Sequence, residues 1–135
     1  NMSVLIDSSV WVDYLRGGQP DLSDRIDEML DADVVYANGT VLGEVLYGAK
    51  NPKAFDALKE TFRGLHLLDD TCEIFARAAQ TGCKLRNDGV TVPLTDIVIA
   101  VQCAKHGLRL LTRDRHFQMI ARRMELQYEM LSNEP

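Results

Sequence analysis

The feature of this sequence that most limits its fold is the alternation of short apolar runs with segments of helical periodicity. Apolar runs of strand length occur at residues 3–6, 34–37, 65–68 and 108–112, and residues 126–130 alternate apolar with polar side chains, as an edge strand does. Between these runs, apolar residues recur every three or four positions. This alternation predicts right-handed βαβ units, and hence an α/β fold in which helices cover both faces of a mostly parallel sheet.

The ends of the expected helices carry residues that are typical of helix caps. The first helix follows Asp7 and Ser8 and ends at Gly17-Gly18. The others are expected after Pro20, from Asn38 or Thr40 to about Gly48, after Pro52, up to Asn87-Asp88-Gly89, over residues 97–106, and over a last segment that holds Phe117, Ile120, Ala121 and Met124. Residues 97–106 are apolar nearly all round, so this helix is expected to be deeply buried.

Length and composition predict one globular domain. The 135 residues, 46% of them hydrophobic and 26% charged, have the balance of an ordinary domain. We expect residues 2–135 to form it, and Asn1, which stands ahead of Met2, to be an addition that takes no part in the fold. The sequence has no apolar run long enough to cross a bilayer and no basic-then-apolar leader, which predicts a cytoplasmic protein without a membrane partner.

Cysteine content and net charge give two further expectations. The three cysteines, Cys72, Cys83 and Cys103, are odd in number and widely spaced, which argues against a disulfide framework or a zinc site and favours buried, reduced thiols. The net charge of −5 argues at first against a nucleic-acid partner. The charge is uneven, however, because the chain up to Glu73 carries −8 and the remainder +3. Composition therefore leaves a locally basic face open.

Four acidic residues follow the expected strands. Asp7 comes directly after the first strand, Glu44 lies in the helix after the second, Asp96 lies in the first turn of the buried helix, and Asp114 comes just past the fourth strand. Ligands of open α/β sheets bind at the carboxyl ends of the strands, so all four side chains are expected to point into one crevice.

Each of these residues also has a purely structural interpretation. Asp7 could cap a helix, Asp96 could stabilise a helix dipole, and Asp114 could be a loop or cap residue. Glu44 is harder to explain in this way. Its helical neighbours are Thr40, Val41, Tyr47 and Gly48, none of which is basic, so its carboxylate needs a partner from elsewhere in the chain.

The convergence of four carboxylates would require either that some of them are protonated or that a cation lies among them. Two carboxylates about 4 Å apart repel by roughly 4 kcal/mol at an effective dielectric constant of about 20. Several such pairs would cost about as much as the whole stability of a domain, roughly 5–15 kcal/mol. Oxygen ligands favour the hard cations Mg²⁺ and Mn²⁺, which can activate water and stabilise a phosphodiester during in-line attack. The pattern therefore favours hydrolytic nuclease chemistry.

Three segments resemble the conserved blocks of PIN domains. "VLIDSSVWVDYLRG" is similar to their opening, in which an Asp and then Ser or Thr follow the first strand. "TVLGEVLYGA" resembles the second block, with a Glu inside an apolar helix. "LRNDGVTVPLTDIVIAVQCAKHGLRLLTRDRHF" resembles the third, with an Asp that opens a buried helix and a strand that ends in Thr-x-Asp. The resemblance covers residues 4–117, and at this length it is greatest to the VapC toxins of toxin–antitoxin pairs.

This resemblance implies a three-layer α/β/α PIN-like fold with a five-stranded, mostly parallel sheet. It implies a Mg²⁺- or Mn²⁺-dependent endoribonuclease that cleaves structured cellular RNA, tRNA or rRNA, by metal-activated water. The implied metal ligands and catalytic residues are Asp7, Asp96, Glu44 and Asp114. Its implied partners are the RNA substrate, a cognate VapB-like antitoxin and a second copy of the chain in a homodimer. Many relatives carry another acid two residues after Asp114, where this sequence has His116.

Several other residues are candidates for supporting roles. Ser8, Ser9 and Thr112 could orient the acidic side chains or water, although capping and turn bonds are equally expected. Candidate phosphate contacts are Arg113, Arg115 and His116, together with Arg16 and Arg86, with solvated surface charge as the alternative. Trp11 and Tyr14 could line an antitoxin groove, but their helical spacing favours core packing.

Two other functions remain as alternatives. The chain could be a PIN-fold RNA-processing nuclease that is not a toxin, or a catalytically inactive PIN scaffold that only binds partners. An aspartate-based phosphatase is disfavoured, because Ser9 stands where a second Asp is needed, and a receiver domain lacks its acidic pair and lysine. DNA flap nucleases are longer and carry more acids.

Overall fold

The chain folds around a parallel sheet, as its alternating pattern predicts. The computed structural model describes residues 2–132, so Asn1 and residues 133–135 lie outside the described part. Within it, strands β1 (Val4–Ile6), β2 (Val35–Asn38), β3 (His66–Leu68), β4 (Arg109–Thr112) and β5 (Tyr128–Met130) form a five-stranded sheet in the order β3-β2-β1-β4-β5. The four pairings are all parallel, and each expected apolar run forms its strand.

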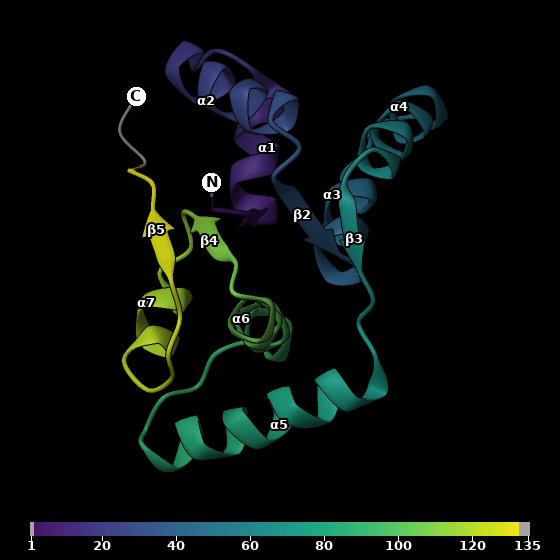
Figure 1. The fold of residues 1–135 in the computed structure, drawn as a ribbon. Coiled ribbons are helices and arrows are strands. Elements are labelled where there is room, and N and C mark those ends of the chain that lie inside the picture. The colour runs from purple at the N-terminus through teal and green to yellow at the C-terminus, as the bar shows by residue number, and fades with distance from the viewer. Residues whose placement is uncertain (1, 133–135) are drawn as a thin grey trace.

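Helices cover both faces of the sheet, which confirms the three-layer α/β/α arrangement (Figure 1). One face carries α1 (Ser8–Arg16), α2 (Pro20–Asp31), α3 (Gly39–Tyr47) and α4 (Pro52–Arg63). The other carries α5 (Cys72–Asn87), α6 (Leu94–His106) and α7 (His116–Ala121). The connections after β1 and β2 cross one face and those after β3 and β4 cross the other. The direction of winding therefore reverses between the neighbouring strands β1 and β4.

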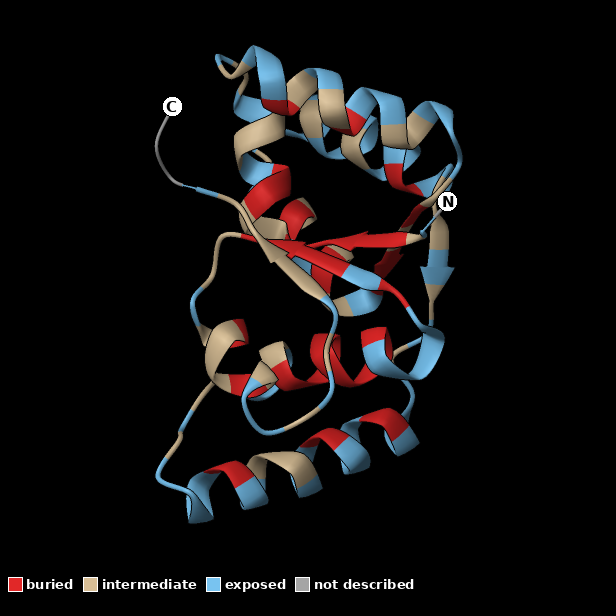
Figure 2. Ribbon diagram, turned by 60° about the vertical axis from the view of Figure 1, so that its left-hand side comes forward, coloured by how far each residue is buried: buried red, intermediate tan, exposed pale blue. Residues whose placement is uncertain are grey.

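Helix α6 is the central helix of its layer. Figure 2 shows it between the sheet and α5, with buried residues around most of its circumference. Residues 97–103 are all buried, which confirms the expectation drawn from their apolar character. A Cβ atom on Gly82 of α5 would lie 3.1 Å from Ile97 Cδ1, so the missing side chain allows the two helices to approach closely.

On the opposite face, aromatic side chains fill the space between α1 and α4. Trp11 is fully buried, and its ring centroid lies 4.9 Å from that of Phe62 and 5.8 Å from that of Tyr14. This confirms core packing for Trp11. Leu15, in contrast, is exposed.

Three local expectations need correction. Cys103 is buried, but Cys72 and Cys83 are exposed on α5, and all three thiols are free. The last helix ends at Ala121, and Met124 follows it in a turn. The alternation of residues 126–130 correctly predicts an edge strand, but burial does not alternate along β5: its three residues are all half-buried, and Arg25 of α2 donates two hydrogen bonds of 2.6 Å to Glu129. In residues 2–132 no helix is both long and apolar enough to cross a membrane.

Candidate active site

The carboxyl ends of β1 and β4 lie side by side at the point where the winding of the sheet reverses. The pairing of Ile6 with Leu111 places Asp7, which follows β1, next to Thr112, the last residue of β4. Crevices of this kind are the usual ligand sites of open α/β sheets. The acidic residues expected from the sequence gather around this point.

Asp7 is the most deeply buried of these acids, with 4% of its surface exposed. It occupies the N-cap position of α1, but its side chain makes no capping hydrogen bond. Instead, its Oδ2 atom accepts hydrogen bonds from Ser9 Oγ at 2.7 Å and from Thr112 Oγ1 at 2.9 Å. The helix-cap alternative therefore does not describe its side chain. Both hydroxyls hold the same oxygen, which fixes the orientation of the carboxylate.

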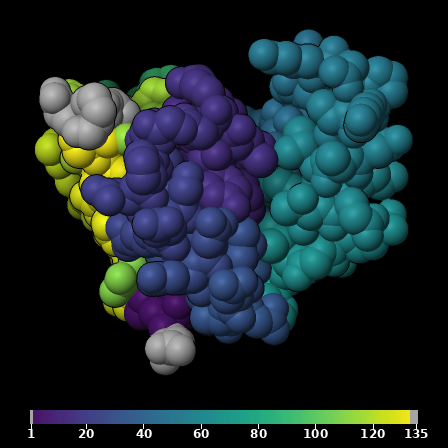
Figure 3. Space-filling view, turned by 90° about the horizontal axis from the view of Figure 1, so that it is seen from above, coloured from purple at the N-terminus to yellow at the C-terminus, as the bar shows by residue number. Residues whose placement is uncertain are grey.

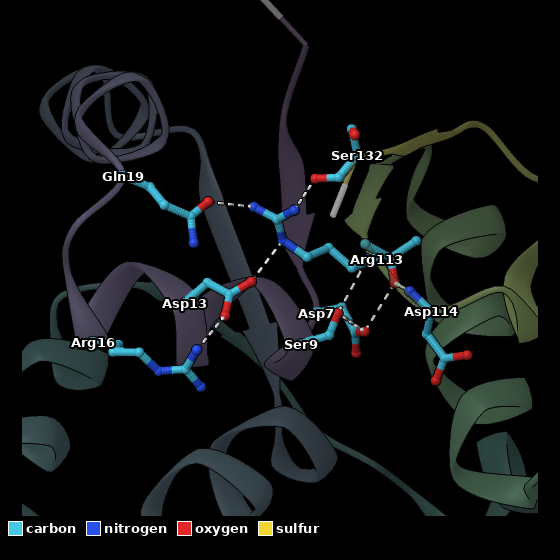
Figure 4. Close-up of polar contacts among 9 residues, drawn as sticks. Asp7, Ser9, Asp13, Arg16, Gln19, Arg113, Asp114 and Ser132 are labelled. Atoms are coloured by element: carbon cyan, nitrogen blue, oxygen red, sulfur yellow. Dashed lines mark hydrogen bonds and ion pairs between the residues drawn. The ribbon is translucent and has the colours of Figure 1, made fainter. Parts of the chain in front are cut away.

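The same two hydroxyls position the loop after β4 (Figure 4). The Arg113 backbone N–H donates to Ser9 Oγ at 3.1 Å, and the Asp114 backbone N–H donates to Thr112 Oγ1 at 2.9 Å. Thr112 is fully buried. The supporting role expected for Ser9 and Thr112 thus has a geometric basis, because they connect Asp7 to the backbone that carries Asp114.

Asp96 and Asp114 meet at His116. The Nδ1 atom of His116 lies 2.8 Å from Asp96 Oδ2 and 3.2 Å from Asp114 Oδ1. The His116 backbone N–H also donates to Asp114 Oδ1 at 2.9 Å, at the start of α7. Among residues 2–132 these three side chains form the one group that brings three potential metal-ligand atoms within 4.8 Å of one another. The sequence motif indicated both acids, but not the contact of the imidazole with them.

Glu44 lies on the other side of Asp7. Its Oε1 atom accepts a hydrogen bond of 3.2 Å from Ser8 Oγ, which comes from the first turn of α1. The partner that Glu44 lacks within its own helix is therefore the hydroxyl beside Asp7. Glu44 and Asp7 lie outside the tight group of Asp96, Asp114 and His116.

The acids influence one another electrostatically. Burial, together with the charges of Asp114 and Asp7, raises the pKa of Asp96 to about 6, against the opposing effect of the His116 hydrogen bond. Burial also raises the pKa of Asp7, with a further contribution from Asp114. Although Glu44 as a whole residue is exposed, partial desolvation of its carboxyl group and the charges of Asp7 and Asp114 raise its pKa. The charges of Asp7 and Asp114 thus raise the pKa values of both Asp96 and Glu44, as expected if the four acids form one cluster.

Among residues 2–132, the acids of this cluster have no basic partner other than the His116 imidazole. Within the described residues, neither lysine nor arginine forms an ion pair with Asp7, Glu44, Asp96 or Asp114. The donor set consists of carboxylate oxygens and one imidazole nitrogen, which is suited to a divalent cation. The cluster therefore fits a metal centre better than a structural ion-pair network.

The side chain of Arg113 faces away from the acids. Its Nε lies 2.7 Å from Asp13 Oδ2, one terminal nitrogen donates to Gln19 Oε1 at 2.9 Å, and the other donates to the Ser132 carbonyl. Figure 4 shows the guanidinium turned toward these partners and away from the Asp114 carboxylate. Of the arginines expected near phosphate in this loop, Arg115 is the one whose side chain is exposed.

Polar contacts at the start of α3 and at the end of β2 were not predicted from the sequence. Asp70 accepts hydrogen bonds from the backbone N–H groups of Gly39 and Thr40, at 2.8 and 2.9 Å, and thereby anchors the start of α3. The buried Gln102 accepts a 2.7 Å hydrogen bond from Asn38 Nδ2, which ties α6 to the end of β2. Both contacts join segments more than 30 residues apart, so no local pattern reveals them.

Comparisons with known proteins identify a family and relatives for the chain. The family model of the PIN domain matches residues 4–123. The chain is similar to "Ribonuclease VapC11" of Mycobacterium tuberculosis, with 31% identity over 129 residues that cover 92% of this chain and 96% of the relative.

Two solved structures show the same fold at lower identity. DNA-bound VapBC from Salmonella typhimurium has a TM-score of 0.79 and 19% identity, over 96% of this chain and 98% of that one. VapBC-5 from Mycobacterium tuberculosis, described as a member of the VapBC family of toxin–antitoxin systems, has a TM-score of 0.65 and 16% identity, over 97% and 100% of the two chains.

Proposed function

The chain belongs to the PIN domain family, and from that premise we propose that it is a Mg²⁺- or Mn²⁺-dependent endoribonuclease that acts as a VapC-type toxin. Its substrate in this proposal is structured cellular RNA, tRNA or rRNA, cleaved in the cytoplasm. The observation that carries the proposal is the convergence of Asp7, Glu44, Asp96 and Asp114 at the β1–β4 switch point, where no lysine or arginine of the described residues pairs with them. A scaffold that only binds partners gains nothing from holding these like charges together.

The proposed ligands of the metal are Asp7, Asp96, Glu44 and Asp114. A bound divalent ion would supply Lewis-acid stabilisation of the phosphodiester and lower the pKa of a water nucleophile. The raised pKa values of Asp7, Asp96 and Glu44 support this assignment, because a cation would relieve the burial and repulsion that raise them. A divalent cation would thus neutralise negative charge that the carboxylates of the site hold close together.

The chain's own residues hold this arrangement in place. Ser9 and Thr112 fix the Asp7 carboxylate through one oxygen. Thr112 also accepts the Asp114 backbone N–H, so the two acids keep a set separation. Arg115, exposed beside Asp114, is our candidate for a contact with the RNA phosphate backbone. This contact would hold the strand without reading its sequence.

We also propose that a VapB-like antitoxin neutralises the chain and that the chain forms a homodimer. The antitoxin partner is supported by the similarity to VapBC structures, one of which is described as a toxin–antitoxin system and another of which is bound to DNA. Figure 3, which looks down on α1–α4, shows the α1–α2 segment beside that of α3–α4. Val12, Leu15 and Tyr47 of these helices are exposed, and they give a partner apolar surface to cover. Size-exclusion chromatography with light scattering tests the dimer.

The metal-dependent activity is tested by RNA cleavage with and without chelator. The parent protein is expected to cleave in Mg²⁺ or Mn²⁺ and to lose activity in excess EDTA. Asp7→Asn is expected to abolish cleavage, whereas Asp56→Asn, which changes an exposed acid of α4, serves as the matched control and is expected to cleave like the parent. Full activity in EDTA, or near-parent activity of Asp7→Asn, would overturn the proposal.

Growth experiments separate a toxin from an RNA-processing nuclease of the same fold. Expression of the parent alone is expected to arrest growth, and expression of Asp7→Asn is not. Co-expression with the antitoxin encoded beside it is expected to restore growth. An active enzyme that is harmless when overproduced would instead identify a PIN nuclease that is not a toxin, and a folded, metal-binding protein without cleavage would identify a scaffold.

A further inference from the structure

We propose that Nδ1 of His116 is a metal ligand, and that His116, Asp96 and Asp114 form a mixed nitrogen–oxygen site that prefers transition-metal ions such as Mn²⁺ to Mg²⁺. The inference rests on the proposed metal-dependent activity and specifies the site that serves it. It assigns to His116 a role other than the phosphate contact considered from the sequence. It also makes the choice of metal a property of one side chain.

The spacing of the three donor atoms matches that of ligands around one small cation. Ligands that bind an ion at about 2.1 Å in octahedral geometry lie about 3 Å apart when they are adjacent. His116 Nδ1 lies 2.8 Å from Asp96 Oδ2 and 3.2 Å from Asp114 Oδ1. All three donor atoms lie within 4.8 Å of one another. The imidazole already occupies the position of a third ligand and needs no large movement to become one.

The backbone holds His116 at this position. Its N–H donates to Asp114 Oδ1 at 2.9 Å, and α7 begins at this residue. Phe117, the next residue, is fully buried and anchors the helix in the core. The exposed fraction of the side chain is 39% for His116 and 13% for Asp96. The site is therefore accessible from solvent on the side of His116. The imidazole is therefore fixed at its backbone and open at its outer edge, as a ligand at the mouth of a site must be.

The chemistry of the imidazole determines the expected metal preference. Mg²⁺ binds oxygen ligands almost exclusively and gains most from carboxylate charge. A neutral imidazole adds no charge, and its nitrogen is a better ligand for transition-metal ions. Asp96 and Asp114 alone supply the charge of this group, so replacing an oxygen ligand by His116 lowers the attraction for Mg²⁺ more than that for Mn²⁺.

The experiment is Mn²⁺ binding to the protein without RNA, followed by electron paramagnetic resonance. Free Mn²⁺ is titrated to obtain affinity, with Mg²⁺ as competitor, and electron spin-echo envelope modulation detects imidazole nitrogen bound to Mn²⁺. The chain has three histidines. His116→Gln removes the proposed ligand, and His106→Gln is the matched control, because His106 is exposed at the far end of α6.

We expect nitrogen modulation in the parent and in His106→Gln, and none in His116→Gln. The preference for Mn²⁺ over Mg²⁺ is expected to fall at least about tenfold in His116→Gln. His116→Asp, which restores an oxygen ligand, is expected to strengthen Mg²⁺ binding. These readouts need no catalysis, so they remain informative if cleavage itself is lost.

Two results would overturn the inference. Mn²⁺ binding without nitrogen modulation in the parent, accompanied by RNA cleavage, would reduce His116 to a hydrogen-bond partner of the acids and leave the proposed nuclease function standing. Absence of Mn²⁺ binding to the parent would remove both the inference and the metal-dependent function.

Discussion

At the scale of single residues, Asp96 shows most clearly how burial and like charge combine in this site. Its pKa in the folded protein is about 6, above the ordinary value of 3.8. Between these values the folded protein binds more protons than the unfolded chain does. The free energy of unfolding of the metal-free protein must therefore fall as the pH rises through this window. Ionised Asp96 costs stability, and a bound cation would recover it.

We expect Asp96→Asn to remove this pH dependence. In EDTA the variant should be more stable than the parent by about 2 kcal/mol above pH 6 and should lose that advantage below about pH 4. Urea unfolding of both proteins across this range measures the difference. The comparison with the parent cancels acids that do not interact with Asp96, such as Glu129, whose pKa is lowered by Arg25. A difference that does not change with pH would contradict this assignment.

The role of the Thr112 hydroxyl can be tested by single substitutions. Its hydroxyl donates to Asp7 and accepts from the Asp114 backbone. We expect Thr112→Val, which keeps the shape of the side chain, to lower cleavage about 10- to 100-fold. It should also lower the free energy of unfolding by about 1–2 kcal/mol. Thr112→Ser keeps the hydroxyl and should retain most of the activity; equal cleavage by all three proteins would show that the bridge is not needed.

The residues of the site were predictable to different degrees. Asp7, Asp96 and Asp114 could be placed from sequence because each follows a strand or begins a helix, and parallel strands bring those positions to one edge. The role of His116 could not, because its contact is with Asp96, 20 positions away on another helix. The Asp-x-His spacing after β4 is the local signal that could have suggested it. The sequence predicts Arg113 as a phosphate contact or a solvated surface charge. Its ion pair with Asp13 could not be predicted, because the two residues meet only in the folded chain.

At the scale of elements, Arg113 joins three parts of the chain. Its guanidinium binds Asp13 of α1, Gln19 in the loop before α2, and the Ser132 carbonyl after β5. Only 9% of its side chain is exposed, so the pair with Asp13 is largely protected from water. This contact stiffens the loop that carries Asp114, although the side chain points away from the acids.

Removing this contact should cost more than removing a surface charge. We expect Arg113→Met and Asp13→Asn each to lower the free energy of unfolding by about 2 kcal/mol, because each removes the shorter of the charged contacts of a partly buried group, while Asp13 keeps its contact with Arg16 and Arg113 keeps Gln19. The double variant should cost less than the sum of the two. Arg115→Met, at the exposed neighbour, is the control and should change stability little. Additive effects in the double-mutant cycle would refute a direct interaction.

The elements themselves were largely predictable because their signals are local. Strand β1, the glycines after α1 and the prolines that open α2 and α4 all lie where the sequence indicates. The failures involve distant contacts. The sequence correctly predicts β5 as a half-exposed edge strand, but not the hydrogen bonds that Arg25 of α2 donates to Glu129 from 104 positions away. Met124 fits the helical period of α7, yet the regular helix ends three residues earlier, at Ala121.

At the scale of the whole molecule, the topology explains why a chain of net charge −5 can carry a nuclease site. The acids converge where β1 and β4 meet, and β4 belongs to the part of the chain with the positive balance. Arg115 therefore stands close to the acidic residues. RNA binding in this account depends on local charge at the site rather than on the sign of the whole protein.

The chemical groups at the ends of the cleaved RNA distinguish attack by water from attack by the ribose. Attack by water on phosphorus with departure of the 3′ oxygen leaves a 5′-phosphate and a 3′-hydroxyl. Attack by the ribose 2′-hydroxyl, the route of ribonucleases that use histidine as a base, leaves a 2′,3′-cyclic phosphate or a 3′-phosphate. Cleavage products formed in Mn²⁺ are to be examined by mass spectrometry and by ligation, with Asp7→Asn as the blank. We expect 5′-phosphate and 3′-hydroxyl ends; cyclic phosphate ends would contradict the account.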